Sequence, residues 1–157
     1  MIRDIYRAIL YFYRWLFRLS RAVSQPLPQV TADDVMMVVR RDFAEEKFGI
    51  VMVVLNEYGV EKWECEKPRV QLAALKLSNG DMETLKRHIT QAKQDYRDVV
   101  AAAEYPEYWT TGMFHVRELP AQEQKQIIDS DWKQYQTWLS PLQIIKRTQN
   151  RDLPPGM

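Results

Sequence analysis

The side chains that most often perform nucleophilic, acid–base or metal chemistry are few in this chain. It has two histidines, His88 and His115, and one cysteine, Cys65. A zinc site on a helix needs a second ligand one turn away, but the residues four positions before and after His88 are a threonine and an alanine. Cys65 stands between two glutamates, whose negative charge disfavours a reactive thiolate. We expect a plain thiol, with a Cys–His nucleophile pair assembled by the fold as the alternative, and no metal site.

Carboxylates that stand close together are the other chemical candidates. The pairs are Asp33 with Asp34, Glu45 with Glu46, and Asp95 with Asp98. The first two pairs open predicted helices, where the helix dipole favours negative charge, and we expect the third on a solvated helix face. The Glu-x-x-His spacing of di-metal bundles is absent, and the five glycines form no phosphate-binding loop. The sequence therefore predicts no catalytic residue and no cofactor.

Association is indicated more strongly than chemistry, because the chain begins with a cationic amphipathic pattern. Residues 1–23 hold five arginines and one aspartate, a net charge of +4, among many large apolar side chains. At about 100° per residue the arginines fall on one narrow stripe of a helix. The predicted contact residues of this helix are Arg3, Arg7, Arg14, Trp15, Arg18 and Arg21.

The apolar face of this first helix must pack against another surface, and three alternatives for that surface remain open. It can pack on its own body, insert into another protein or a second copy, or lie on an anionic membrane. Nucleic acid is disfavoured, because residues 24–157 carry a net charge of −3 and large aromatics on a phosphate-binding helix would be unexplained. The longest uncharged apolar run, residues 8–13, is too short for a signal peptide or a spanning helix.

A second candidate contact surface lies in residues 105–118, which are rich in aromatic and turn residues. We call Tyr105, Tyr108, Trp109 and Phe114 the aromatic patch. Amphipathic rings are enriched at the centres of protein interfaces, so the patch can anchor a partner. The same rings can instead plug one end of a helical bundle.

The rest of the sequence predicts helices that would position these residues. Pro26 and Pro28 predict a linker at residues 24–30, between an amphipathic helix at 1–23 and a helical domain at 31–145. Residues 146–157 are expected to form a flexible tail. The run 50–55 is β-branched and would suit a strand, but its flanks favour a helix. Pro141 should break or kink the last helix. The predicted helices begin near residues 31, 43, 68, 81 and 119.

The predicted fold class is thus all-α, a compact bundle of about five helices preceded by the cationic amphipathic helix. Residues 69–77, 79–81, 95–100 and 104–106 resemble segments of small, uncharacterised bacterial all-helical proteins. This resemblance implies a bacterial protein and no particular activity. The single cysteine excludes an internal disulfide and fits a reducing compartment, so we expect the cytoplasm.

These features predict a non-enzymatic protein-interaction module, of the adaptor or toxin-neutralising kind. Its contact surface would be the N-terminal helix or the aromatic patch, and its partner another protein or a second copy. The alternative is a peripheral membrane protein, anchored at the inner membrane face by the Arg-striped helix. An enzyme whose site leaves no sequence signature is the third hypothesis.

Overall fold

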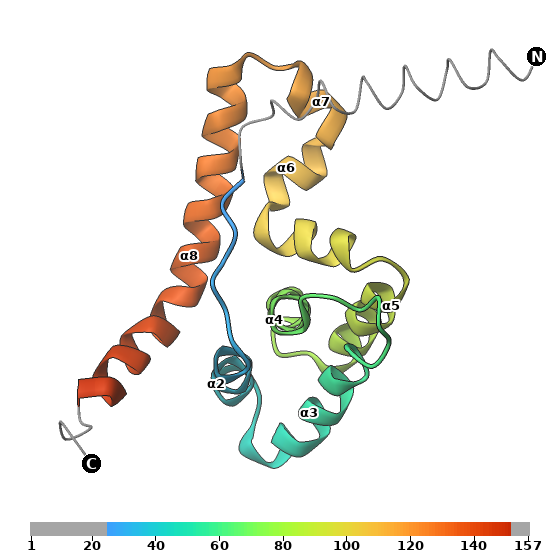
Figure 1. The fold of residues 1–157 in the computed structure, drawn as a ribbon, viewed down its shortest axis with the longest axis vertical. Helices are drawn as coiled ribbons and strands as arrows, with labels where there is room; N and C mark the ends of the chain where they lie inside the picture. Colours follow the sequence, from blue (N-terminus) through green and yellow to red (C-terminus); the bar gives the residue numbers. More distant parts are fainter. Residues whose placement is uncertain (1–24, 152–157) are drawn as a thin grey trace, which may run out of the picture.

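The computed structural model describes residues 25–151 (Figure 1). Residues 1–24 and 152–157 lie outside the described part, and with them the predicted N-terminal helix and its contact residues Arg3, Arg7, Arg14, Trp15, Arg18 and Arg21. The described elements are α2 (Ala32–Asp42), the 3-10 helix η2 (Glu45–Lys47), α3 (Phe48–Asn56), α4 (Lys67–Ser78), α5 (Met82–Glu104), α6 (Pro106–Thr111), α7 (Met113–Glu118) and α8 (Ala121–Arg151).

The predicted all-α bundle is confirmed for this part of the chain, which contains no strand. The five predicted helices of the body correspond to α2, α3, α4, α5 and α8, and the β-branched run 50–55 is helical. Residues 105–118, expected to be irregular, instead form the two short helices α6 and α7. Pro106 occupies the first turn of α6, and Gly112, with φ of 92°, separates the two.

The centre of the bundle is the α4–α5 hairpin, and local sequence explains its sharp turn. Asn79 and Gly80 both have positive φ, 48° and 79°, which ends α4. Asp81 then caps α5, because its carboxylate accepts the backbone N–H of Thr84 at 2.8 Å. A Cβ on Gly80 would stand 2.8 Å from the Asp42 carbonyl oxygen, so the turn lies directly against the end of α2.

Helix α4 is buried around most of its circumference. Residues 70–75 are all buried, and Figure 1 shows α4 nearly end-on among its neighbours. A helix that is apolar on nearly all sides belongs at the middle of a bundle. The surrounding core side chains come from α2, α3, α5 and α8, and include Val38, Val39, Val51, Leu55, Leu85, Ile89 and Tyr135.

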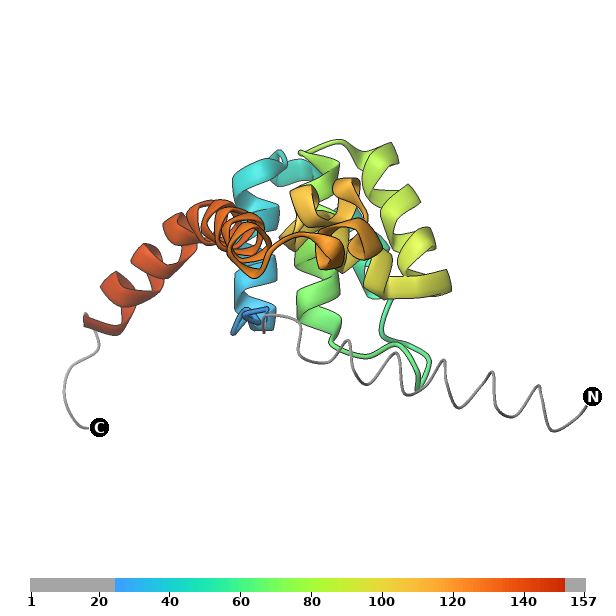
Figure 2. The same ribbon diagram turned by 90° about the horizontal axis from the view of Figure 1, so that it is seen from above.

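Helix α8 lies along one side of the bundle (Figure 2). It is held by Tyr105 of the body, whose ring stacks on Trp132 of α8 with centroids 6.5 Å apart. Within α8, Trp132 in turn stacks on Tyr135 with centroids 6.3 Å apart. The guanidinium of Arg41 in α2 also lies 4.9 Å from the ring centroid of Trp138 and donates to its carbonyl oxygen at 3.1 Å.

Two predictions concern the end of the chain, and α8 bears on both. A break or a kink was predicted at Pro141. The helix continues without a break to Arg151, and its ribbon bends in the C-terminal part (Figure 2), as a kink would. A proline inside a helix removes one hydrogen bond and bends the axis without ending the helix. The predicted tail, residues 146–157, started too early, because residues 146–151 are helical.

Candidate functional site

Helix α5 is kinked at Asp95, and the residues from this kink to the end of the helix form one wall of the candidate site. Asp95 has φ of −150° and ψ of 102°, which are not helical values. Its carboxylate accepts the backbone N–H of Arg97 at 3.0 Å and pairs with the Arg97 guanidinium at 2.6 Å. Aspartate can compete with helical hydrogen bonds in this way, and it restarts the helix as an N-cap would. Asp98 consequently lies in the first turn of the second half of α5.

A buried ion pair joins this second half to α4. The Arg69 guanidinium donates to both carboxylate oxygens of Glu104, each at 2.7 Å, and also to Glu66 at 2.5 Å. Glu104 is fully buried, whereas the Glu66 side chain is 46% exposed. Burial raises the pKa of Glu104, against the effect of Arg69, and the hydrogen bond to Glu104 raises the pKa of Arg69. Arg69 is therefore saturated by carboxylates of its own chain.

Helix α6 is fixed from two sides. The buried carboxylate of Asp131 in α8 accepts the backbone N–H groups of Glu107 at 3.1 Å and Tyr108 at 2.9 Å, which caps α6 from a distant part of the chain. Just before α6, the hydroxyl of Tyr105 donates to the carbonyl oxygen of Pro26 at 2.6 Å. Burial raises the pKa of Tyr105, so this hydroxyl stays protonated and donates.

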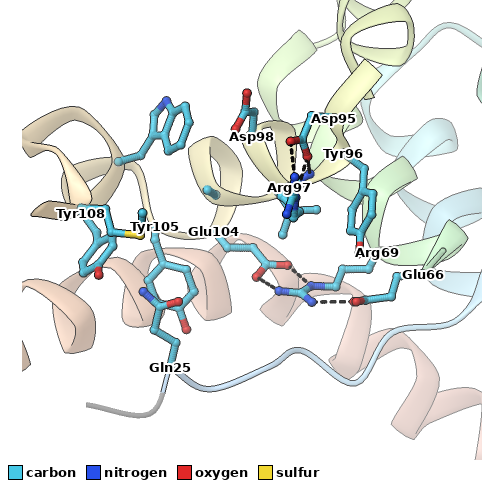
Figure 3. Close-up of a pocket in the computed structure, with 14 residues that line it drawn as sticks. Gln25, Glu66, Arg69, Asp95, Tyr96, Arg97, Asp98, Glu104, Tyr105 and Tyr108 are labelled. Carbon is cyan, nitrogen blue, oxygen red and sulfur yellow. Dashed lines mark hydrogen bonds and ion pairs between the residues drawn. The ribbon is translucent and has the colours of Figure 1, made fainter. Parts of the chain in front are cut away.

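These contacts surround a cavity of about 530 Å³ (Figure 3). Its walls are the start of α4, the second half of α5, and residues of α6 and α7, with Gln25 at one edge. Four aromatic rings line it, those of Tyr96, Tyr105, Tyr108 and Trp109. A volume of this size suits one or two side chains of a partner or a small ligand.

The charged side chains of the cavity give it a negative balance. Four carboxylates, Glu66, Asp95, Asp98 and Glu104, face two guanidinium groups, Arg69 and Arg97, so the formal net charge is −2. Both arginines are paired with carboxylates. Asp98 makes no hydrogen bond or ion pair with any residue from 25 to 140, the range whose side chains the structure describes. The cavity therefore suits a group that combines a positive charge with apolar surface.

Exposed apolar side chains adjoin the cavity on the α6–α7 side. Trp109 and Met113 are each 43% exposed and also line the cavity, and Phe114 is 59% exposed. We call these three residues the α6–α7 face. Neighbouring apolar side chains that remain this open are typical of contact surfaces.

The structure separates the members of the predicted aromatic patch. Tyr105 is buried against Trp132, as expected of a ring that plugs the bundle, and Tyr108 is half-buried in the cavity wall. Trp109 and Phe114 reach the surface. The patch thus combines both positions that the sequence left open, and its role in contacting a partner stays a prediction.

The three residues with nucleophilic or metal-binding side chains stand apart from the cavity. His88 is half-buried on α5, and burial lowers its pKa. His115 on α7 and Cys65 before α4 are exposed. None of the three lines the cavity, and no cluster of three metal-binding side chains occurs between residues 25 and 151. No helix in this same range is long and apolar enough to cross a membrane.

Comparison of the chain with protein-family models, with curated proteins and with solved structures finds no match. The cavity is therefore interpreted from its own geometry. The sequence analysis did not predict that the charged residues of the cavity form a site, although the sequence contains one indication of it. Arg69 and Glu104 are charged residues at the edges of apolar runs, residues 70–75 and 99–103, where a charge needs a partner if it is buried.

Proposed function

We propose that this chain is a non-enzymatic protein-interaction module whose contact surface is the α6–α7 face together with the adjoining cavity. The observation that carries the proposal is the exposure of Trp109 and Met113 at the rim of a cavity that their own side chains help to line. Interface hot spots combine a large anchor residue with a pocket that excludes water. An adaptor or toxin-neutralising role is consistent with such a surface.

The rigidity of α6 supports this proposal. A helix of six residues is too short to be stable alone, but Asp131 caps its start and Tyr105 precedes it in the core. A surface that is ordered before binding loses little conformational entropy when a partner docks. Trp109 is thus presented in a fixed position.

The proposal can be tested with a random 16-residue peptide display library and the full-length protein. We expect selected peptides whose affinity falls at least tenfold in Trp109→Ala, since truncation of a hot-spot residue has effects of this size. Ile50→Ala and Val53→Ala serve as controls, because these α3 side chains are 60% and 66% exposed but do not line the cavity. Selected peptides that bind Trp109→Ala and the unsubstituted protein equally would contradict the proposal.

The membrane hypothesis is distinguished by a separate measurement on the same protein. Full-length protein is sedimented with vesicles of phosphatidylcholine containing phosphatidylglycerol, at low and high salt. Salt-sensitive co-sedimentation that is unchanged in Trp109→Ala would favour a peripheral membrane protein at the inner membrane face. An interaction module of the cytoplasm is expected to stay in the supernatant.

A further inference from the structure

The first described residue of the chain lies at the edge of the cavity. Gln25 is part of its lining, and the next residue, Pro26, is held by the hydroxyl of Tyr105 at 2.6 Å. Residues 1–24 are therefore joined, through the peptide bond to Gln25, to a point at the edge of the cavity that Pro26 holds in place. This tether limits how far the segment can be from the site, whatever conformation it has.

The nearest arginine of the segment is within reach of the cavity interior. Arg21 precedes Gln25 by four residues, and four residues span at most about 14 Å when fully extended. A tether this short holds the guanidinium at an effective concentration in the millimolar range. Even a weak site at this position is then substantially occupied.

The charges of the cavity and of the segment are complementary. The cavity carries a formal net charge of −2, with Asp98 unpaired among the described residues, and residues 1–23 carry +4. Arg69 and Arg97 each make their direct ion pair with another carboxylate, and the Arg97 charge reaches Asp98 only through space. A further guanidinium group that entered the cavity could thus form an ion pair with Asp98.

The apolar surfaces are complementary as well. Leu19 and Val23 flank Arg21 in the sequence, and Trp109 and Met113 form the open rim of the cavity. Arginine also packs its planar group against aromatic faces, of which the cavity offers four.

We propose that residues 1–24 of this chain occupy the cavity, with the Arg21 guanidinium paired to Asp98 and its apolar neighbours against Trp109 and Met113. The inference concerns the same surface as the proposed function but needs no partner protein. If both hold, the segment and a partner compete for the same cavity.

Limited trypsin digestion of the full-length protein tests this contact, because trypsin must extract Arg21 to cleave after it. We expect Asp98→Asn to raise the cleavage rate after Arg21 about threefold, the size of effect that a half-exposed ion pair gives. High salt should raise the rate in the unsubstituted protein in the same way. Cleavage after Arg3 is the internal reference and should change little.

The control variant is Asp33→Asn. Asp33 also lies in the first turn of a helix and has no ion pair within residues 25–140, but it is exposed on α2 and does not line the cavity. Its substitution removes the same interaction with a helix dipole and should leave the cleavage rate after Arg21 unchanged. Equal rates in Asp98→Asn and in the unsubstituted protein would overturn the proposal.

Hydrogen exchange keeps the proposal testable if Asp98→Asn is poorly folded. In the full-length protein, Arg21→Gln should speed the exchange of the α6 backbone amides at least twofold, whereas Arg3→Gln should not. Protection from trypsin that grows with protein concentration, or that requires vesicles, would place the segment on a second copy or on lipid and overturn the assignment. If the display library yields no peptide that depends on Trp109 but Arg21 is still protected from trypsin, the proposed function is contradicted and the present inference stands.

Discussion

The guanidinium of Arg69 and the carboxylate of Glu104 meet in two hydrogen bonds of 2.7 Å that connect the first turn of α4 to the last residue of α5. Glu104 is fully buried and the Arg69 side chain is 15% exposed. A buried pair of this kind is costly to break, because the remaining charge stays in an apolar surrounding. It therefore fixes the angle at which α5 enters the cavity wall.

Breaking this pair should destabilise the protein strongly. Arg69→Met leaves Glu104 buried without its partner, and we expect the free energy of unfolding in urea to fall by about 3–5 kcal/mol. The double variant Arg69→Met, Glu104→Leu removes both charges and should cost much less. Glu66→Gln is the control, since the Glu66 side chain is 46% exposed and its ion pair contributes at most about 1 kcal/mol. A double variant less stable than Arg69→Met would contradict this account.

The cap that Asp131 places on α6 is expected to contribute to both stability and order. Asp131→Ala removes the acceptor for two backbone N–H groups and should lower the free energy of unfolding by about 1–2 kcal/mol. Amide exchange at Glu107 and Tyr108 should become faster. Asp129→Ala is the matched control on α8, because its side chain is 63% exposed and stands 3.9 Å from Lys125. Unchanged exchange at Tyr108 would show that α6 does not depend on the cap.

Removal of the hydroxyl group should have different effects on the free energy of unfolding at two buried tyrosines. The Tyr135 hydroxyl is buried and has no hydrogen-bond partner within the described chain, so Tyr135→Phe should leave the free energy of unfolding unchanged or raise it by about 1 kcal/mol. Tyr105→Phe loses the hydrogen bond to Pro26 and should lower it by about 1 kcal/mol. Chemical denaturation of the two variants side by side measures the difference. A larger loss in Tyr135→Phe than in Tyr105→Phe would refute the assignment.

Much of the fold was predictable because its helices carry local signals. Asp81 caps α5 and Gly80 ends α4, and both act through neighbouring backbone groups that the sequence reveals. The kink in α5 was missed because no glycine or proline marks it. It depends on whether the Asp95 carboxylate bonds to its own backbone or to water, a choice that tertiary packing decides.

The candidate site was predictable only in part, for a similar reason. Residue types alone drew attention to Trp109 and Phe114, which reach the surface beside the cavity. The partners of the cavity wall are distant in the sequence, since Arg69 and Glu104 are 35 positions apart and Tyr108 and Asp131 are 23 positions apart. Pairs of this kind follow from how α4, α5 and α8 pack, and no local pattern encodes them.

The loop before α4 should make the stability of the protein depend on pH. One carboxylate oxygen of the buried Glu64 accepts three backbone N–H groups, from Gly59 at 2.8 Å, Val60 at 2.7 Å and Glu61 at 3.0 Å. Burial by itself would raise the pKa of Glu64, but the three donors together outweigh it and hold the pKa below the usual value of 4.5. The folded protein therefore binds this proton more weakly than the unfolded chain.

The sign of the pH effect follows from this lowered pKa. The contribution of Glu64 to the free energy of unfolding is fully present above about pH 4.5 and is lost as the pH falls through the lower pKa of the folded state. Glu64→Gln should therefore be less stable than the unsubstituted protein at pH 7, and the gap should narrow steadily below pH 4.5. Glu61→Gln, an exposed neighbour whose backbone N–H is retained, should show no such gap. Urea unfolding at pH 7, 5, 4 and 3 measures both differences, and a Glu64→Gln gap that stays constant across this range would rule out a role for the Glu64 charge.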